Sequence, residues 1–86
     1  MTRLTIYSTG SCPVCEKTKN LLSKWRIPYH EIRLDQEPSE LRRFTKLTEG
    51  ARTVPQILID DAWIGGFTEL TEMHMEDQLD DLMEPS

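Results

Sequence analysis

The sequence predicts an α/β protein in which a small β-sheet is covered by helices on both faces. Three observations support this: short stretches of alternating apolar and polar residues, longer stretches with apolar residues every three or four positions, and prolines and glycines between them. Their order is β-α-β-α-β-β-α. Helices between the first strands, followed by a closing hairpin, are typical of a sheet with helices packed on it.

The first strand is predicted at residues 3–8 and the first helix at 13–26. Leu4 and Ile6 alternate with their neighbours, as in a strand with one buried face. Pro13 occupies the position where a helix often begins with proline, because its fixed φ suits the first turn. The apolar stripe of the helix is formed by Val14, Thr18, Leu21, Leu22 and Trp25. A proline beyond this stripe ends the helix.

The middle of the chain alternates again over residues 29–34, which predicts the second strand, and a turn follows at 35–38. The second helix has a buried face of Leu41, Phe44 and Leu47. Two short apolar runs at 57–59 and 62–64 are separated by two aspartates. This arrangement predicts a β-hairpin.

The last predicted helix is interrupted. Two apolar stripes lie on opposite sides of this segment at helical spacing, one of Leu70, Met73 and His74, the other of Met75, Leu79, Leu82 and Met83. One straight helix would bury only one of them. We therefore expect a helix near 68–74, a break at 75–77 and a short helical segment near 78–83.

Length and composition exclude several classes of protein. The chain has 86 residues, so we expect a single domain over 1–86 and a monomer. A net charge of −5 argues against nucleic acid as a partner. No apolar stretch is long enough to span a membrane, so we expect no membrane partner either. The start of the chain lacks a targeting pattern, which predicts a cytoplasmic protein. Acidic residues gather at 69–86, typical of a solvated face that favours basic partners.

Cys12 and Cys15 stand where the first strand has ended and the first helix begins. The N-terminus of a helix favours negative charge, so Cys12 should ionise more readily than a free thiol, whose pKa is about 8.5. Its thiolate can attack a disulfide sulfur, and Cys15, almost one turn further on, can then release the product. Stapling the fold is a weak reason for two cysteines so close together.

Two other interpretations of the cysteine pair remain open. A zinc site needs four ligands, and the only other soft candidates, His30 and His74, lack metal-site spacing. Inert buried thiols need apolar surroundings, but the segment 8–11 is polar and indicates an exposed loop. Trp25 and Trp63 are interpreted as packing residues.

Four segments in register make the chain resemble the glutaredoxin family of thioredoxin-like proteins. They are Ile6-Tyr7, Cys12-Pro13-Val14-Cys15, Thr53-Val54-Pro55-Gln56-Ile57 and Ile64-Gly65-Gly66-Phe67-Thr68-Glu69-Leu70. The resemblance implies a thioredoxin-like fold, a four-stranded mixed sheet flanked by three helices. It also implies a thiol–disulfide oxidoreductase that uses glutathione to reduce protein disulfides and glutathione mixed disulfides, with no permanently bound cofactor.

The resemblance also implies a set of site residues. Cys12 and Cys15 are the catalytic pair, and Pro55 matches the family's cis-proline, which leaves the backbone of Val54 free to pair with an extended peptide. The glycine pair at 65–66 lets the γ-glutamyl end of glutathione approach, and Thr68 begins the last helix and offers N–H groups to a carboxylate. The implied glutathione-binding set is Thr9, Val14, Arg52, Thr53, Val54, Pro55, Gly65, Gly66, Phe67, Thr68 and Glu69.

Several positions depart from the family pattern. Thr9 stands where many members have a lysine, which leaves Arg52 as the candidate cation. Val14 replaces a frequent tyrosine and so removes an aromatic wall. Thr68-Glu69 replaces a common pair of aspartates, so that Glu69 is the acidic side chain left for the glutathione amino group.

These departures keep two other functions in view. One is a glutaredoxin-like electron donor to ribonucleotide reductase, recycled by a flavoprotein thioredoxin reductase. Such proteins usually lack the glycine pair, so residues 65–66 favour glutathione. The other is an iron–sulfur binding module in which two chains and two glutathiones hold a cluster through Cys12. Pro13 restrains the loop and disfavours it.

Overall fold

The computed structural model describes residues 2–84, and their secondary structure follows the predicted order. The elements are β1 (Leu4–Ser8), α1 (Pro13–Lys24), β2 (Tyr29–Arg33), η1 (Pro38–Glu40), α2 (Leu41–Leu47), β3 (Gln56–Ile59), β4 (Ala62–Gly65), α3 (Phe67–Met75) and η2 (Asp80–Leu82), where η marks a 3₁₀ turn. Within these residues no helix is long and apolar enough to cross a membrane.

The four strands form one mixed sheet in the order β2-β1-β3-β4. β1 runs parallel to β2 and antiparallel to β3, and β4 completes a hairpin with β3. Tyr7 near the end of β1 pairs with Gln56 at the start of β3. The loop that leaves β1 and the loop that enters β3 therefore meet at the same end of these two inner strands. Both cysteines lie at this end of the sheet.

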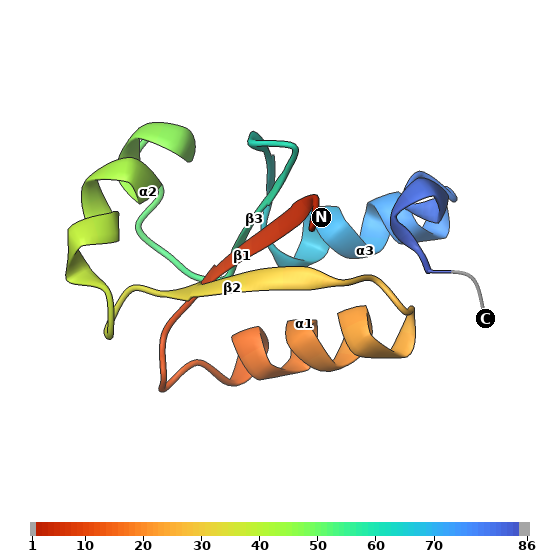
Figure 1. The fold of residues 1–86 in the computed structure, drawn as a ribbon, viewed down its shortest axis with the longest axis horizontal. Coiled ribbons are helices and arrows are strands. Elements are labelled where there is room, and N and C mark those ends of the chain that lie inside the picture. Colours follow the sequence, from red (N-terminus) through yellow and green to blue (C-terminus); the bar gives the residue numbers. More distant parts are fainter. Residues whose placement is uncertain (1, 85–86) are drawn as a thin grey trace.

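Helices cover both faces of the sheet, as predicted (Figure 1). α1 and α3 pack on one face, around a core of Leu4, Ile6, Leu22, Ile27, Ile57, Leu70 and Leu79. α2 packs on the other face, where the core consists of Tyr7, Ile32, Phe44 and Leu58.

β1 differs from its prediction, because both of its faces are buried. Tyr7 is 1% exposed and packs edge-on against Phe44, with ring centroids 5.1 Å apart. Ser8 is also buried and belongs to the strand rather than to an exposed loop. Alternate side chains of β1 point into different cores, Leu4 and Ile6 into one and Tyr7 into the other. Both faces of this inner strand are buried because helices cover both faces of the sheet.

The chain after α3 breaks where the two apolar stripes predicted it. α3 ends at Met75, Asp77 takes a positive φ of 60°, and η2 begins at Asp80. This turn brings Leu79 back into the same core as Leu70, where it is 0% exposed. The expected break in the helix is thereby confirmed.

Candidate active site

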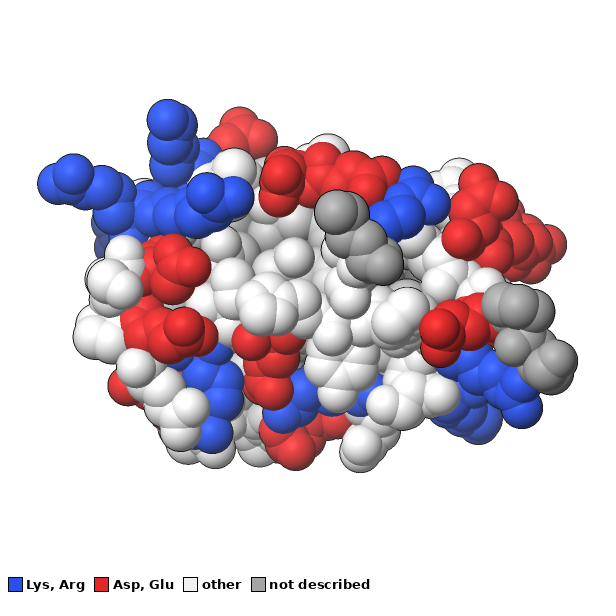
Figure 2. Space-filling view, in the orientation of Figure 1, with Lys and Arg blue, Asp and Glu red and all other residues white. Residues whose placement is uncertain are grey.

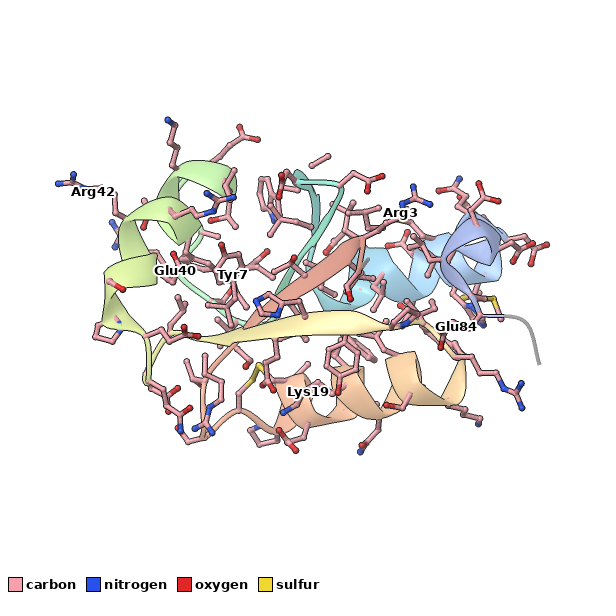
Figure 3. The ribbon with its side chains drawn as sticks, viewed as in Figure 1. Arg3, Tyr7, Lys19, Glu40, Arg42 and Glu84 are labelled. Carbon is pink, nitrogen blue, oxygen red and sulfur yellow. A yellow bond between two sulfur atoms is a disulfide. The ribbon has the colours of Figure 1, made fainter. Side chains whose placement is uncertain are left out.

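The two cysteines lie at the start of α1, where the first turn of the helix holds both. Cys12 is the N-cap residue and is half-buried, whereas Cys15 is 0% exposed. They are joined by a disulfide with Cα atoms 5.2 Å apart, so this structure is the oxidised form (Figure 3). The more accessible sulfur is the one that sequence analysis predicts to attack.

The Cys12 sulfur accepts a hydrogen bond from a backbone amide in the first turn of α1. The amide of Cys15 donates to Cys12 Sγ over 3.0 Å, and α1 points its positive end at this atom. Lys19, one turn further along α1, is committed elsewhere, with Nζ lying 2.6 Å from Glu16 Oε2 and 2.9 Å from Glu31 Oε2. The N-terminus of α1 is therefore the group that the structure places to stabilise a thiolate on Cys12.

A network of hydrogen bonds supports the active-site loop from below. Ser8 Oγ donates to Glu31 Oε2 over 2.6 Å, and Lys19 binds the same carboxylate. Partial burial opposes ionisation of Glu31, but the hydrogen bonds from Ser8 and Lys19 outweigh it and lower the pKa of Glu31. The network ties β1, β2 and α1 together at the point where the chain leaves the sheet.

The loop that enters β3 faces the cysteines from the opposite side. The peptide bond between Val54 and Pro55 is cis, as the resemblance implies, and Pro55 is buried. The carbonyl oxygen of Val54 lies 3.7 Å from Cys12 Sγ. The backbone of Val54 is thus placed beside the reactive sulfur.

The glycine pair lets the start of α3 pack against this loop. A Cβ atom on Gly66 would lie only 3.0 Å from the Pro55 carbonyl oxygen, and one on Gly65, where φ is +116°, would meet the Glu69 side chain at 2.6 Å. Glu69 Oε1 accepts a hydrogen bond of 2.7 Å from the Gly66 amide and so caps the helix. Glycine at both positions therefore has a packing reason.

α3 begins one residue earlier than predicted. Gly66 is its N-cap and Phe67 its first residue, so Thr68 does not begin the helix but lies exposed in its first turn. The first backbone bond of the helix runs from the Leu70 amide to the Gly66 carbonyl over 3.1 Å. The amides of residues 67–69 precede that bond and are the helix's N-terminal donors.

A cavity of about 540 Å³ opens between the cysteine loop, the cis-proline loop and α3. It is lined by Val14, Thr53, Val54, Pro55, Gln56, Trp63, Gly66, Phe67, Thr68 and Glu69. Most of the predicted glutathione-binding set is thus brought together around one cavity. Gly65 does not line the cavity itself but precedes Gly66, which does. The Nζ atom of Lys17 lies over the Phe67 ring, 5.1 Å from its centroid.

Thr9 and Arg52 are not brought together with that set. They line a second cavity of about 470 Å³, between the two active-site loops and α2. Its full lining is Thr9, Leu34, Asp35, Leu41, Phe44, Thr45, Ala51, Arg52 and Val54. Val54 lines both cavities and therefore marks the boundary between them.

Two residues that line the larger cavity, Gln56 and Trp63, were not predicted as site residues from the sequence. Trp63, expected to be a buried or half-exposed packing residue, is 37% exposed and also lines the larger cavity. Its indole N–H donates to Gln56 Oε1 over 2.9 Å, and Gln56 Nε2 donates to the Thr53 carbonyl over 3.1 Å. The sequence does contain one indication of this role for Gln56, which directly precedes the apolar residues of β3. A glutamine buried at the start of such a strand needs hydrogen-bond partners for its side chain.

Fold and site together define a class of protein. A cysteine pair that follows the first strand of a mixed sheet, begins a helix and faces a cis-proline is the arrangement of a thioredoxin-like thiol–disulfide oxidoreductase. Comparison with known proteins places the chain more closely. The glutaredoxin family model matches residues 4–64, and the chain belongs to the glutaredoxin family.

Relatives agree over nearly the whole chain. A Rickettsia prowazekii glutaredoxin 1 is 44% identical over 82 residues, which cover 92% of this chain and 84% of the relative. A glutaredoxin of Neisseria meningitidis serogroup A is 37% identical and covers 99% of this chain and 100% of its own. These matches and the Cys12–Cys15 pair identify a dithiol, glutathione-dependent thiol–disulfide oxidoreductase.

Solved structures show the same fold. A buckwheat glutaredoxin in complex with glutathione is 30% identical and superposes with a TM-score of 0.80, covering 94% of this chain and 76% of its own. A Brucella melitensis glutaredoxin is 34% identical with a TM-score of 0.75, over 96% of this chain and 89% of its own.

Proposed function

We propose that the larger cavity binds glutathione, with the glutathione sulfur directed at Cys12. The observation that carries this proposal is that the cavity runs from the first turn of α3 to Val54, whose carbonyl oxygen lies 3.7 Å from Cys12 Sγ. One end offers helix amides, which suit a carboxylate, and the other adjoins the reactive sulfur. The buckwheat relative crystallised with glutathione supports the same ligand.

Each part of the cavity then has a role in binding. The backbone of Val54 pairs with the extended cysteinyl part of glutathione, next to the buried Pro55. The amides of Phe67 and Thr68 bind the carboxylate at the γ-glutamyl end, since they precede the first bond within α3. The glycine pair allows this end to approach the backbone closely.

For a glutathionylated protein the reaction uses Cys12 alone. The Cys12 thiolate attacks the glutathione sulfur, a Cys12–glutathione disulfide forms, and the protein sulfur leaves as a thiolate that takes up a proton. The thiolate of a second glutathione then attacks the bound glutathione sulfur. Oxidised glutathione leaves, and the Cys12 thiolate is restored.

For a protein disulfide both cysteines take part. Cys12 attacks one sulfur of the substrate to form a mixed disulfide, and the Cys15 thiolate attacks Cys12 Sγ. The substrate leaves as a dithiol and the Cys12–Cys15 disulfide of this structure results. Two glutathione molecules reduce it in turn and leave as oxidised glutathione. This cycle belongs in a reducing compartment such as the cytoplasm, with glutathionylated or disulfide-containing proteins as partners.

Substitution of each cysteine tests these roles. We expect Cys12→Ser to abolish both reactions, because no attacking thiolate remains. Cys15→Ser should lose reduction of protein disulfides yet keep reduction of glutathionylated substrates, measured with NADPH, glutathione and glutathione reductase. An equal loss in both assays for Cys15→Ser contradicts the assignment.

The same assay separates glutathione from the second electron source. The protein is supplied either with NADPH, glutathione and glutathione reductase or with NADPH and thioredoxin reductase. We expect activity with the first set, because the glycine pair lets the glutathione cavity form. Activity with the second set alone identifies instead a donor to enzymes such as ribonucleotide reductase.

A further inference from the structure

The loop between β1 and α1 is held by β2 and by the turn that follows β2. In Figure 1 the chain leaves β1 for α1 and leaves β2 for α2 at the same end of the sheet. The two strands are parallel, and Ser8 pairs with Arg33. The amide of Leu34 still donates to the Ser8 carbonyl over 2.9 Å. When this register is extended by two residues, Gly10 stands opposite Asp35.

Beyond that last backbone bond, a side chain joins the loop to β2. The Gly10 amide donates to Asp35 Oδ2 over 3.0 Å, and Arg33 Nη2 donates to the same oxygen over 2.9 Å. The hydrogen bond from Arg33, with that from Gly10, holds the pKa of Asp35 below its usual range. The group that binds the loop at neutral pH is therefore a carboxylate.

Glycine at position 10 allows this contact. A Cβ atom there would overlap Arg33 Nη2 and would lie 2.8 Å from Asp35 Oδ2. Arg33 Nε is buried as well, and among the residues that the structure describes it has no hydrogen-bond partner. Because a buried donor without a partner is costly, this arginine is held here by Asp35 and by its packing on the loop. We call the contact of Gly10, Arg33 and Asp35 the loop clamp.

The loop clamp lies directly before the reactive cysteine. Only Ser11 separates Gly10 from Cys12, the N-cap residue of α1. At the N-cap, Cys12 Sγ accepts from the Cys15 amide over 3.0 Å and lies 3.7 Å from the Val54 carbonyl oxygen. The path of the loop therefore determines where this sulfur lies relative to the helix terminus that stabilises its thiolate.

We propose that Asp35 and Arg33 are positioning residues for the reaction, which hold Gly10 and so keep the Cys12 thiolate at the N-terminus of α1. This inference rests on the proposed role of Cys12 as the attacking thiol. The role is one of position, because the negative charge of Asp35 by itself opposes a second negative charge on Cys12. Loss of the contact and loss of the charge therefore have opposite effects on the ionisation of Cys12.

Three variants separate position from charge. Asp35→Ala removes both the acceptor and the charge, whereas Asp35→Asn removes the charge and keeps an oxygen that can accept from the Gly10 amide. Gly10→Ala keeps both charges but forces the Arg33 and Asp35 side chains away from the loop. All three variants leave the other charged groups near this pair in place, which are Glu16, Lys19, Glu31 and Arg52.

The measurement is the rate at which iodoacetamide modifies Cys12 in the reduced protein across a pH series. We expect the curves of Asp35→Ala and Gly10→Ala to move upward by about one pH unit, because the thiolate loses its place at the helix terminus. Asp35→Asn should recover most of this shift. In the first two variants, kcat/KM for a glutathionylated peptide should fall several-fold at neutral pH and return toward the wild-type value in alkaline solution.

Asp60→Ala is the matched control for a loss of stability. Asp60 is exposed and forms a comparable ion pair with Arg3, whose Nη2 lies 2.7 Å from Asp60 Oδ2. It follows β3 at the end of the sheet away from the cysteines. We expect Asp60→Ala to unfold at a lower temperature than the wild type without any shift of its alkylation curve. Asp35→Ala should fold, because the Asp35 side chain is exposed.

The results distinguish this inference from the proposed function. Shifts of equal size in Asp35→Ala and Asp35→Asn show that charge rather than position acts on Cys12, and they overturn the inference. Unshifted curves in Asp35→Ala and Gly10→Ala, or an equal shift in Asp60→Ala, overturn it as well. In each case a wild-type Cys12 that reacts at neutral pH leaves the proposed function in place. A wild-type Cys12 that is not modified at neutral pH overturns the proposed function itself.

Discussion

Cys12 and Cys15 differ in exposure although they share one helical turn. Cys12 is half-buried at the N-cap, where the Cys15 amide lies 3.0 Å from its sulfur, and Cys15 is fully buried. In the reduced protein that amide and the helix terminus stabilise a thiolate on Cys12. Position in the helix and burial therefore assign the two cysteines different roles.

This difference predicts the order of alkylation in the reduced protein. Iodoacetamide should modify Cys12 at a pH below the range in which a free thiol with a pKa of about 8.5 ionises, while Cys15 stays unmodified. Mass spectrometry after short exposures across a pH series measures both sites. Simultaneous modification of the two cysteines, or none at neutral pH, contradicts this account of the site.

Trp63 and Gln56 give a second prediction at the residue scale. Trp63→Ala removes one wall of the larger cavity and leaves Gln56 Oε1 without its donor, which costs about 1–3 kcal/mol for a buried polar atom. We expect KM for a glutathionylated peptide to rise several-fold with kcat little changed. Trp63→Phe, which keeps a ring but not the N–H, should lose stability in chemical denaturation yet recover most of the KM. Equal KM values in all three proteins refute a role for the ring.

The positions of the site residues along the chain were easier to predict from the sequence than their grouping around the cavities. The helix start at Pro13 fixes both cysteines, and the register between β1 and β3 brings the cis-proline to them. Thr9 was grouped with the glutathione site because it stands where many family members have a lysine, and Arg52 because it precedes Thr53. In the structure they line the second cavity, which shares Val54 with the larger one, and no periodic pattern encodes the direction of a loop side chain.

At the scale of elements, the Ser8–Glu31–Lys19 network joins β1, β2 and α1 beneath the active-site loop. The pKa of Glu31 is lowered in the folded protein, so the stabilisation is present above the unfolded value of about 4.3. It is lost as the pH falls through the folded pKa of Glu31. The network therefore holds the loop at neutral pH and weakens in acid.

Replacement of this carboxylate tests that dependence. We expect Glu31→Gln to lower the free energy of unfolding at pH 7, and the difference from the wild type to vanish in acid below the folded pKa. Urea titrations across the pH range measure it. Glu72→Gln is the control, because Glu72 is exposed on α3, and it should change little at any pH. A difference that persists in acid shows that the effect of Glu31 is not one of charge.

Periodic patterns predicted the elements because burial imposes them. The strands and helices occur where alternation and helical spacing indicated, and the break after α3 follows from two stripes that no single helix can bury. The patterns were less informative for β1, where alternation predicted one buried face and the structure buries both, each in a different core. They also missed the helix start at Gly66, since glycine offers no capping side chain and the Glu69 carboxylate caps from within the helix.

At the scale of the whole molecule, composition gave the sign of the charge but not its place. Acidic residues dominate the C-terminal segment, whereas lysine and arginine side chains gather over α2 at the other end of the molecule (Figure 2). Only the fold shows which charges stand beside the second cavity.

The segment after α3 completes the larger core through Leu79, so the stability of the whole molecule depends on how this segment packs. Met75 and Leu79 belong to the same predicted stripe, yet Met75 is 80% exposed and Leu79 is 0% exposed among Leu22, Ile27 and Leu70. We expect Leu79→Ala to cost about 2–5 kcal/mol through lost burial and the cavity left behind. A loss of 1 kcal/mol in the free energy of unfolding lowers the midpoint of thermal unfolding by about 4–8 °C for a domain of this size. Thermal unfolding of Leu79→Ala should therefore occur at least about 8 °C lower, whereas Met75→Ala should unfold within about 2 °C of the wild type. Because Leu79 lies outside both cavities beside the cysteines, its variant should keep the wild-type KM for glutathionylated peptides at temperatures where it is folded. Equal shifts for the two variants show that the segment after the break does not complete the core.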